Sequence, residues 1–259
     1  MHPNETRAKT FRALHSPGRP LILFNAWDAG SAKAVTDAGA RAIATGSWSV
    51  AASHGLEDGE KLPLHQVIAN LDRIVRATDL PVSVDIESGY GETFCEVGQA
   101  ISRTIEAGAI GCNMEDSLPG TTTLRAAHDM ADRIGWARRA ANAAGIPYFI
   151  NARTDVFFQA TPDAHDRAML DEAVARGRIY AESGADGLFV PGLVDRELMR
   201  ELAAQSPLPV NVMMVDGSPD LQKIAAAGIA RISHGPGPYL LAMRALGDAA
   251  ATAFESQAG

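Results

Sequence analysis

The sequence has little that would tie it to a membrane, a nucleic acid or a disulfide scaffold. Only two cysteines occur in 259 residues, Cys95 and Cys112, so no disulfide framework is available and a reducing, cytoplasmic setting is expected. No run approaches the roughly 20 apolar residues that span a bilayer, and the polar N-terminus, MHPNETRAKTF, lacks the apolar segment of a secretory signal. Acidic residues outnumber Lys and Arg by 31 to 23, which argues against a broad surface for nucleic acids or anionic membranes.

The chain nevertheless has the composition of a folded protein. Hydrophobic residues make up 46% and charged residues 21% of it, values that exclude disorder as a description of the whole chain. A length of 259 residues is enough to bury a large core. No linker or low-complexity segment divides the sequence, so we expect residues 1–259 to form a single domain.

A recurring phrase organises the sequence. A helical pattern ends in glycine and a short hydrophobic run follows at once, as in DAGARAIAT (37–45), EAGAIGCNM (106–114) and ESGADGLFV (182–190). Glycine readily adopts the left-handed conformation that ends a helix. The runs are rich in Val, Ile and Ala without polar alternation, as is typical of parallel strands buried on both faces. The predicted strands are Leu21–Trp27, Ala42–Ser47, Val82–Glu87, Ile110–Glu115, Tyr148–Asp155, Gly187–Val190, Val210–Val215 and Arg231–His234.

A helical pattern follows each predicted strand, at about residues 30–38, 64–77, 94–107, 124–143, 165–183, 195–204, 219–227 and 239–255. Thr93 with Glu96 predicts a capping box, and Ser218 before Pro219 predicts another helix start. Eight strand-helix units predict a (β/α)8 TIM barrel, an α/β fold. A doubly wound open sheet is the alternative, but no GxGxxG follows the first strand, as a dinucleotide-binding version would require.

In a barrel the active site lies at the carboxyl ends of the strands. The third predicted strand ends SVDIESGYGE, and the two-residue alternation of a strand puts Asp85 and Glu87 on one face, toward the barrel mouth. By the same alternation, Asn113 and Glu115 face inward from the fourth strand. The long connection Trp48–Pro63 is interpreted as a functional loop.

The fifth predicted strand ends INARTD, where Asn151, Arg153 and Asp155 share a face. Two interpretations of Arg153 stay open at this point. The guanidinium either neutralises the neighbouring acids, or it binds an anionic oxygen of a substrate.

Three carboxylates from two neighbouring strands would converge at this mouth, those of Asp85, Glu87 and Glu115. Buried like charges repel and raise one another's pKa unless a cation neutralises them. Oxygen donors without His or Cys favour Mg²⁺ or Mn²⁺ over zinc. The alternative is that Asp85 and Glu87 only cap the following helix or pair with an arginine.

Together, DIESGYG, NMEDS and NART at the ends of three successive strands resemble the isocitrate lyase/phosphoenolpyruvate mutase superfamily. FNAWDAGSAK and GSWSVAASHGLED (46–58) are similar to that family's first and second strand segments. The resemblance extends from about Leu21 to Ala242, and it is closest to a short bacterial branch with NAWDA and NARTDVF. It implies a Mg²⁺-dependent barrel acting on small 2-oxo acids or their enolates. It also implies a homo-oligomer, a tetramer or a dimer, that exchanges its last helix, here Tyr239–Phe254.

The same resemblance implies roles for individual residues. Asp85 would ligate Mg²⁺ directly, and three further carboxylates would hold it mainly through water, those of Asp58, Glu87 and Glu115. Arg153 would contact the enolate oxygen. The remaining substrate contacts would come from the backbone N–H groups of Gly46, Ser47 and Trp48 and from the side chains of Asn113 and Asn211, the last holding a second carboxylate.

The chain departs from the family in the loop after the fourth strand. The lyases carry a Lys-Lys-Cys-Gly-His loop whose Cys is the general acid, and the phosphonate mutases carry a Lys and an Asn there. This chain has EDSLPGTTTLRAAHD instead, and Pro191-Gly192 replaces the lyases' Glu after the sixth strand. Neither cleavage of isocitrate or methylisocitrate by the known acid nor phosphonate mutase activity is therefore expected.

Other residues are candidates for moving a proton. His54 lies in the second-strand loop, His128 begins the helix after the fourth strand, and His234 ends the eighth strand. Cys95 falls in a first helical turn, which lowers a thiol pKa, and a packed, inert thiol is the alternative. A structural role is the alternative for each histidine.

The sequence thus predicts a Mg²⁺-dependent lyase for a small 2-oxo- or 2-hydroxy-carboxylate, working through an enolate by C–C cleavage or decarboxylation. Two alternatives are a C–P bond hydrolase or mutase, and a non-catalytic binder of 2-oxo acids. A phosphate-binding barrel, suggested by SHGPGPY, is disfavoured because Pro236 and Pro238 lack N–H groups. The expected partner is a small carboxylate, with no nucleic acid and no membrane.

Overall fold

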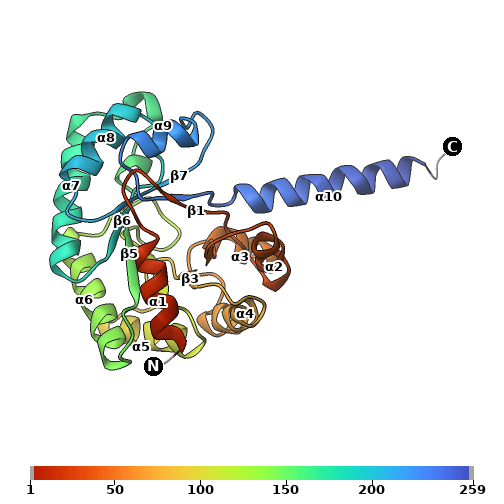
Figure 1. The fold of residues 1–259 in the computed structure, drawn as a ribbon, viewed down its shortest axis with the longest axis horizontal. Coiled ribbons are helices and arrows are strands. Elements are labelled where there is room, and N and C mark those ends of the chain that lie inside the picture. Colours follow the sequence, from red (N-terminus) through yellow and green to blue (C-terminus); the bar gives the residue numbers. More distant parts are fainter. Residues whose placement is uncertain (1–2, 257–259) are drawn as a thin grey trace.

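The fold is a barrel of parallel strands. The computed structural model describes residues 3–256, and its sheet has the order β1-β8-β7-β6-β5-β4-β3-β2. A parallel bridge between Ala26 and Thr45 joins β1 to β2, so the barrel is nearly closed (Figure 1), which confirms the TIM barrel and excludes the open sheet. The strands are β1 Leu21–Leu23, β2 Ile43–Ala44, β3 Val82–Asp85, β4 Gly111–Glu115, β5 Phe149–Arg153, β6 Gly187–Phe189, β7 Val210–Met213 and β8 Arg231–Ser233.

Helices surround the barrel. All eight predicted helices are present, with each end within three residues of its predicted position. The α-helices are α1 Pro3–Ala13, α2 Ala29–Asp37, α3 Ser47–Ser53, α4 Leu64–Arg76, α5 Phe94–Glu106, α6 Ala127–Ala143, α7 Arg167–Glu182, α8 Arg196–Gln205, α9 Leu221–Ala226 and α10 Gly237–Glu255. Two short 3₁₀ helices, η1 Val156–Phe158 and η2 Pro162–Ala164, follow β5.

Some local expectations need correction. The connection Trp48–Pro63 is not all loop, because most of α3 lies within it. Helix α9 does not start at Ser218, whose Oγ instead accepts the N–H of Val215 (3.0 Å). It starts after Asp220, whose carboxylate accepts the N–H of Lys223 (2.8 Å) and also suits the positive end of the helix dipole. The capping box of Thr93 and Glu96 is confirmed.

A layer of polar side chains fills the barrel below its mouth. Asn151 donates from Nδ2 to Oδ1 of Asn113 (2.9 Å) and to Oδ1 of Asn211 (3.0 Å). Arg231, fully buried, donates from Nη2 to Oδ1 of Asn113 (3.1 Å). Because these bonds join β4, β5, β7 and β8, the layer forms a rigid floor under the strand ends.

Asn25 closes the mouth where β1 and β2 meet. Its Nδ2 donates to the carbonyl oxygen of Thr45 (2.9 Å). Its Oδ1 accepts the N–H groups of His234 and Gly235, each at 3.0 Å. One side chain therefore ties together the ends of β1, β2 and β8.

Helix α10 extends away from the barrel at the C-terminal end of the described chain (Figure 1). It exposes several large apolar side chains, those of Leu240, Leu241, Met243, Leu246 and Phe254. None of the helices in residues 3–256 has the length and apolar character needed to cross a membrane. The single domain expected over 1–259 stays a prediction, and its ends, 1–2 and 257–259, lie outside the described residues.

Candidate active site

A cavity of about 180 Å³ opens at the mouth of the barrel. Its walls come from the carboxyl ends of the strands and from the segments that follow them, as expected for a barrel active site. The lining residues are Asn25, Gly46, Ser47, Trp48, Asp58, Asp85, Asn113, Arg153, Phe158, Phe189, Met213, Ser233, Gly235 and Pro236. A wider space of about 620 Å³ adjoins it under the loop after β4 and shares Asp58, Arg153 and Phe158 with it.

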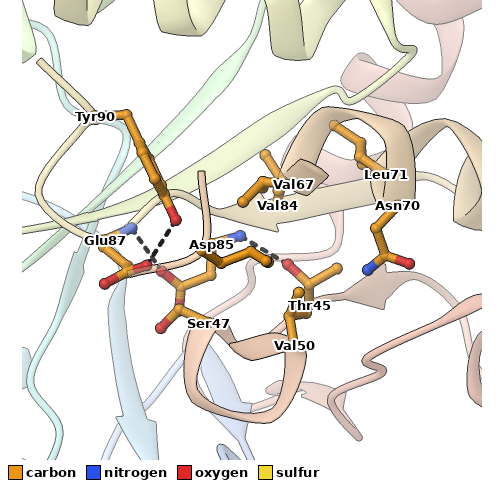
Figure 2. A pocket seen from close by; sticks show the side chains of 11 residues that line it. Thr45, Ser47, Val50, Val67, Asn70, Leu71, Val84, Asp85, Glu87 and Tyr90 are labelled. Carbon is orange, nitrogen blue, oxygen red and sulfur yellow. Dashed lines mark hydrogen bonds between the residues drawn. The ribbon is translucent and has the colours of Figure 1, made fainter. Parts of the chain in front are cut away.

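Asp85 lines the cavity as predicted, but Glu87 lines neither of the two spaces at the mouth. Strand β3 ends at Asp85, and Glu87 adopts a left-handed backbone conformation with φ +50°, so strand alternation does not place it. Figure 2 shows the hydroxyl of Tyr90 directed at Glu87, whose Oε1 it reaches at 2.8 Å. The hydroxyl oxygen of Thr45 accepts the N–H of Asp85 at 2.9 Å. Burial raises the pKa of Asp85, and burial followed by the charge of Asp58 raises that of Glu87 to about 7.

Glu87 holds the loop that carries Asp58. Its Oε2 accepts the N–H of Gly59 (2.7 Å) and that of Glu60. Glu60 in turn accepts the hydroxyl of Ser88 at Oε1 (2.8 Å). One oxygen of Glu87 is thus bound to backbone donors and the other to the Tyr90 hydroxyl, so the carboxylate fixes the loop that places Asp58 beside the cavity.

Asp58 has an unmet hydrogen-bonding requirement. Its Oδ1 is buried and has no partner in the part of the chain that the structure describes. Burial raises the pKa of Asp58 more than Ser47 and Arg153 lower it. Because buried polar atoms are normally satisfied, this oxygen is placed to bind something that the protein itself does not supply.

Arg153 lies between two acids. Its Nη1 is 2.7 Å from Oε2 of Glu115, and its Nε is 2.6 Å from Oδ1 of Asp155. Burial lowers the pKa of Arg153, but these two carboxylates outweigh burial and raise it, so the guanidinium stays charged. Burial raises the pKa of the Glu115 carboxyl, and Arg153 opposes that rise.

A buried network that the sequence did not reveal supports this pair. Asp116 is fully buried and accepts the hydroxyl of Tyr180 (2.7 Å) and Nη1 of Arg176 (3.1 Å) at Oδ2. Its Oδ1 accepts the N–H of Asp155 (3.0 Å), while Ser117 donates to Oδ2 of Asp155 (2.7 Å). The network therefore orients Asp155 against the arginine.

The residues present fit a hard divalent cation. Asp58 and Asp85 both line the cavity, Asp58 has an oxygen to spare, and burial raises the pKa of both carboxyls. No three His, Cys, Asp or Glu side chains within residues 3–256 are grouped to hold a metal ion. The predicted set of four carboxylates is therefore not assembled: Asp58 and Asp85 line the cavity, Glu87 holds a loop and Glu115 pairs with Arg153. One or two carboxylates, with several waters, are the kind of set that binds Mg²⁺ in proteins.

The structure brings together most of the predicted substrate contacts. Ser47 and Trp48 form the first turn of α3, with Gly46 as its N-cap, and all three line the cavity with Asn113 and Arg153. The first turn of a helix carries N–H groups without helical acceptors. Asn211 lies outside the lining, because its amide is bonded to the carbonyl oxygens of Val212 (2.8 Å) and Arg231 (3.2 Å).

The predicted proton donors lie elsewhere. His54 is exposed at the end of α3, with Nδ1 2.9 Å from the carbonyl oxygen of Val50. His128 is exposed on α6, and the His234 ring lies against Phe24 with centroids 5.0 Å apart. Cys95 is exposed rather than packed. None of these side chains lines the two spaces at the mouth.

The loop after β4 folds over the mouth as a small hairpin. Ser117 and Leu124 form an antiparallel bridge, and the N–H of Leu118 donates to the carbonyl oxygen of Thr123 (2.9 Å). At its tip Gly120 lies against Gly59, so close that a Cβ on Gly59 would be 2.6 Å from the Gly120 backbone. The loops after β2 and β4 therefore meet above the site.

The chain is similar in sequence to proteins of one family. A family model described as phosphoenolpyruvate phosphomutase matches residues 11–254. An uncharacterized protein of Mycobacterium tuberculosis (strain H37Rv) is 32% identical over 246 residues, covering 93% of this chain and 87% of that protein. The 2-methylisocitrate lyase of Escherichia coli (strain K12) is 30% identical over 223 residues, covering 82% of this chain and 71% of the lyase.

Solved structures are also similar to this chain. A crystal structure from Burkholderia cenocepacia J2315, provisionally named a phosphonomutase, has a TM-score of 0.93 and 56% identity, covering 99% of this chain and 100% of that one. Phosphonopyruvate hydrolase in complex with oxalate and Mg²⁺ has a TM-score of 0.83 at 20% identity, covering 96% of this chain and 87% of that one, a likeness of fold alone. As the motifs implied, the chain belongs to the phosphoenolpyruvate phosphomutase family, within the isocitrate lyase/phosphoenolpyruvate mutase superfamily.

Proposed function

We propose that this protein is a Mg²⁺-dependent lyase that acts on a small 2-oxo- or 2-hydroxy-carboxylate, by C–C cleavage or decarboxylation. One observation carries the proposal: Asp58, with its unpartnered oxygen, lines the same small cavity as Asp85 and Arg153. Mg²⁺ held by the two carboxylates would neutralise them and polarise the substrate's carbonyl group.

The chain's own residues would position the substrate and stabilise developing negative charge. The first-turn N–H groups of Ser47 and Trp48 would hold the carboxylate. Arg153, kept charged by Glu115 and Asp155, would face the oxygen on which an enolate's charge develops. Asn113, fixed by the polar floor, would donate from its amide to the bound acid.

The residue types that line the site also favour a second candidate, a non-catalytic binder of 2-oxo acids. Among the described residues that line the two spaces at the mouth there is no His, Cys, Lys or Tyr. A lyase of this kind would take its final proton from water. The C–P hydrolase or mutase alternative has no comparable observation in its favour, since the hairpin after β4 lacks the mutases' Lys and Asn.

Isothermal titration with oxalate, with and without Mg²⁺, tests the site. We expect binding that requires Mg²⁺ and that is lost in Asp85→Ala. Turnover of oxaloacetate, 2-alkylmalates and 2-oxo monocarboxylates then separates the lyase from the binder. Oxalate binding that ignores Mg²⁺, or turnover that survives Asp85→Ala, would show that the proposed metal site is wrong.

We also propose that the protein is a homo-oligomer in which α10 of one copy covers another. The outer side of β1 exposes Ile22 (44%) and Phe24 (40%), beside a groove of about 360 Å³ between β1 and α2. An apolar helix that projects from one copy and an uncovered apolar strand on another are complementary surfaces. The cytoplasmic setting inferred from cysteine content stays a prediction.

A further inference from the structure

Two sets of side chains line the cavity at the mouth, a polar half and an apolar half. The polar half includes Asp58, Asp85, Asn113 and Arg153. The apolar half, or apolar wall, consists of Trp48, Phe158, Phe189, Met213 and Pro236. Its members come from the start of α3, from η1, from the ends of β6 and β7 and from the start of α10.

Two glycines make room for this wall. A Cβ on Gly192 would lie 2.8 Å from Cδ1 of Phe158, and a Cβ on Gly235 would lie 2.5 Å from Sδ of Met213. Both glycines also have positive φ, +86° and +52°, which other residues rarely adopt. A side chain at either position would therefore displace an apolar group that lines the cavity.

The apolar wall offers no partner for a second charge on a ligand. Arg153 is the one cation among the described residues that line the cavity, and two carboxylates already pair with it. The rings of Phe158 and Phe189 lie 5.7 and 6.0 Å from its guanidinium carbon. An unpaired carboxylate buried on this side would be strongly disfavoured.

Another cation, Arg231, is part of the floor. Arg231 is fully buried and donates to Oδ1 of Asn113 (3.1 Å), with its Nε 3.4 Å from Oγ of Ser233. It is not part of the cavity lining. Its Nη1 has no partner among the described residues, but the side chain is fully buried outside the lining, so it does not provide a counter-charge at the apolar wall.

We propose, on the basis of the function proposed above, that the ligand is a 2-oxo or 2-hydroxy acid with a single carboxylate and a short apolar substituent, and not a dicarboxylate. The carboxylate and its neighbouring oxygen occupy the polar half, and the substituent packs against Phe158, Phe189 and Met213. The cavity, of about 180 Å³, has room for such a short substituent.

A matched pair of ligands tests this. 2-Oxopentanoate and 2-oxoglutarate have the same chain length and differ only in a terminal methyl or carboxylate. In titrations of the Mg²⁺-loaded protein, 2-oxopentanoate is expected to bind at least about tenfold more tightly. Oxalate serves as the reference, because it reports the polar half alone.

The outcomes separate this inference from the proposed function. Mg²⁺-dependent oxalate binding together with 2-oxoglutarate affinity equal to or above that of 2-oxopentanoate overturns the inference and leaves the proposed function standing. Failure of oxalate to bind overturns the proposed function, and the inference with it.

A variant of the wall provides a second readout. Met213→Lys adds a cation to the apolar side, so the affinity ratio of 2-oxopentanoate to 2-oxoglutarate should fall by about tenfold or more. Leu221→Lys, on the exposed start of α9 and outside the cavity, should leave that ratio unchanged. An unchanged ratio in a folded Met213→Lys protein, checked by its thermal melt, would count against the apolar wall as the specificity element.

Discussion

A single oxygen, Oδ1 of Asp58, connects the protein's stability to its proposed activity. It is buried without a partner among the described residues, and burial raises the pKa of its carboxyl, so the ionised form destabilises the metal-free protein. We expect Asp58→Asn to raise the free energy of unfolding in EDTA by about 1 kcal/mol. Urea unfolding would measure this change.

The same variant should lose its response to Mg²⁺. Wild-type protein is expected to melt at a higher temperature with Mg²⁺, because a ligand that binds only the folded state stabilises it. Asp58→Asn should show little or no such rise. A variant that is less stable in EDTA yet keeps the full rise would contradict the role given to Asp58.

His15, at the other end of the barrel, should make the folded protein less stable in acid. Its ring stacks on Phe149 with centroids 4.1 Å apart, and burial, assisted by the charge of Arg231, lowers its pKa to about 3. Between pH 6.5 and 3 the unfolded chain binds a proton that the folded protein does not. His15 therefore does not lower the free energy of unfolding above pH 6.5. Below that pH, its titration lowers the free energy of unfolding by about 1.4 kcal/mol per pH unit.

His15→Leu isolates this contribution. As the pH falls below 6.5, the unfolding free energy of the variant should decrease less steeply than that of the wild type. The difference between the two slopes should correspond to about one bound proton. Denaturant titrations at several pH values would measure both slopes. Equal slopes would mean that His15 titrates normally in the folded protein.

Polar residues of the site were more predictable than apolar ones. Asp85, Asn113 and Arg153 stand out because polar side chains are rare on buried strands. Phe158, in η1, and Met213, at the end of β7, could not be distinguished from core residues, because an apolar side chain looks the same in sequence whether it faces a helix or a cavity. The orientation of the backbone decides this.

At the scale of elements, the contact between the loops after β2 and β4 matters most. Gly59 has φ +98°, and its Cβ would be 2.6 Å from the Gly120 backbone. Gly59→Ala should therefore displace Asp58 and weaken Mg²⁺-dependent oxalate binding by about tenfold or more. Isothermal titration would measure the loss.

Gly55→Ala is a matched control for that change. Gly55 also has positive φ, +73°, but a Cβ there would have nothing within 4 Å. The Gly55→Ala variant should therefore have the backbone strain of Gly59→Ala without its steric clash. Its oxalate affinity should stay within about twofold of wild type. If both variants lost oxalate affinity to a similar extent, backbone strain alone would explain the loss, and the contact between Gly59 and Gly120 would not be needed.

Two helices escaped prediction for different reasons. Helix α3 has only seven residues, too few to show a helical period. Helix α1 is mostly polar, and its contribution to the core depends on two buried side chains, Ala8 and Phe11. The Phe11 ring meets that of Phe149 edge-on at 5.5 Å, a contact that only the folded barrel creates.

At the scale of the whole molecule, α10 should control the oligomeric state. Leu241 and Leu246 are 63% and 64% exposed, so in the proposed assembly they would lose that exposure. We expect Leu241→Lys combined with Leu246→Lys to reduce the molar mass in solution to that of one chain, because charges would be buried in the contact. Light scattering after size-exclusion chromatography would measure it.

Asp248→Lys on the same helix is the control, since it changes the charge of an exposed residue and leaves the apolar side chains in place. It should keep the oligomer. A wild-type protein that is itself a single chain would contradict the proposed assembly.

The sequence alone determined the barrel, the family and the acidic character of the mouth. Strand and helix periods are local, and the motifs at strand ends are short, so both can be recognised without coordinates. The tertiary structure decided that Glu87 holds a loop, that Asn211 lies beneath the cavity, and that no predicted histidine lines it. These depend on backbone turns and on side chains from distant strands, which meet only when the barrel closes.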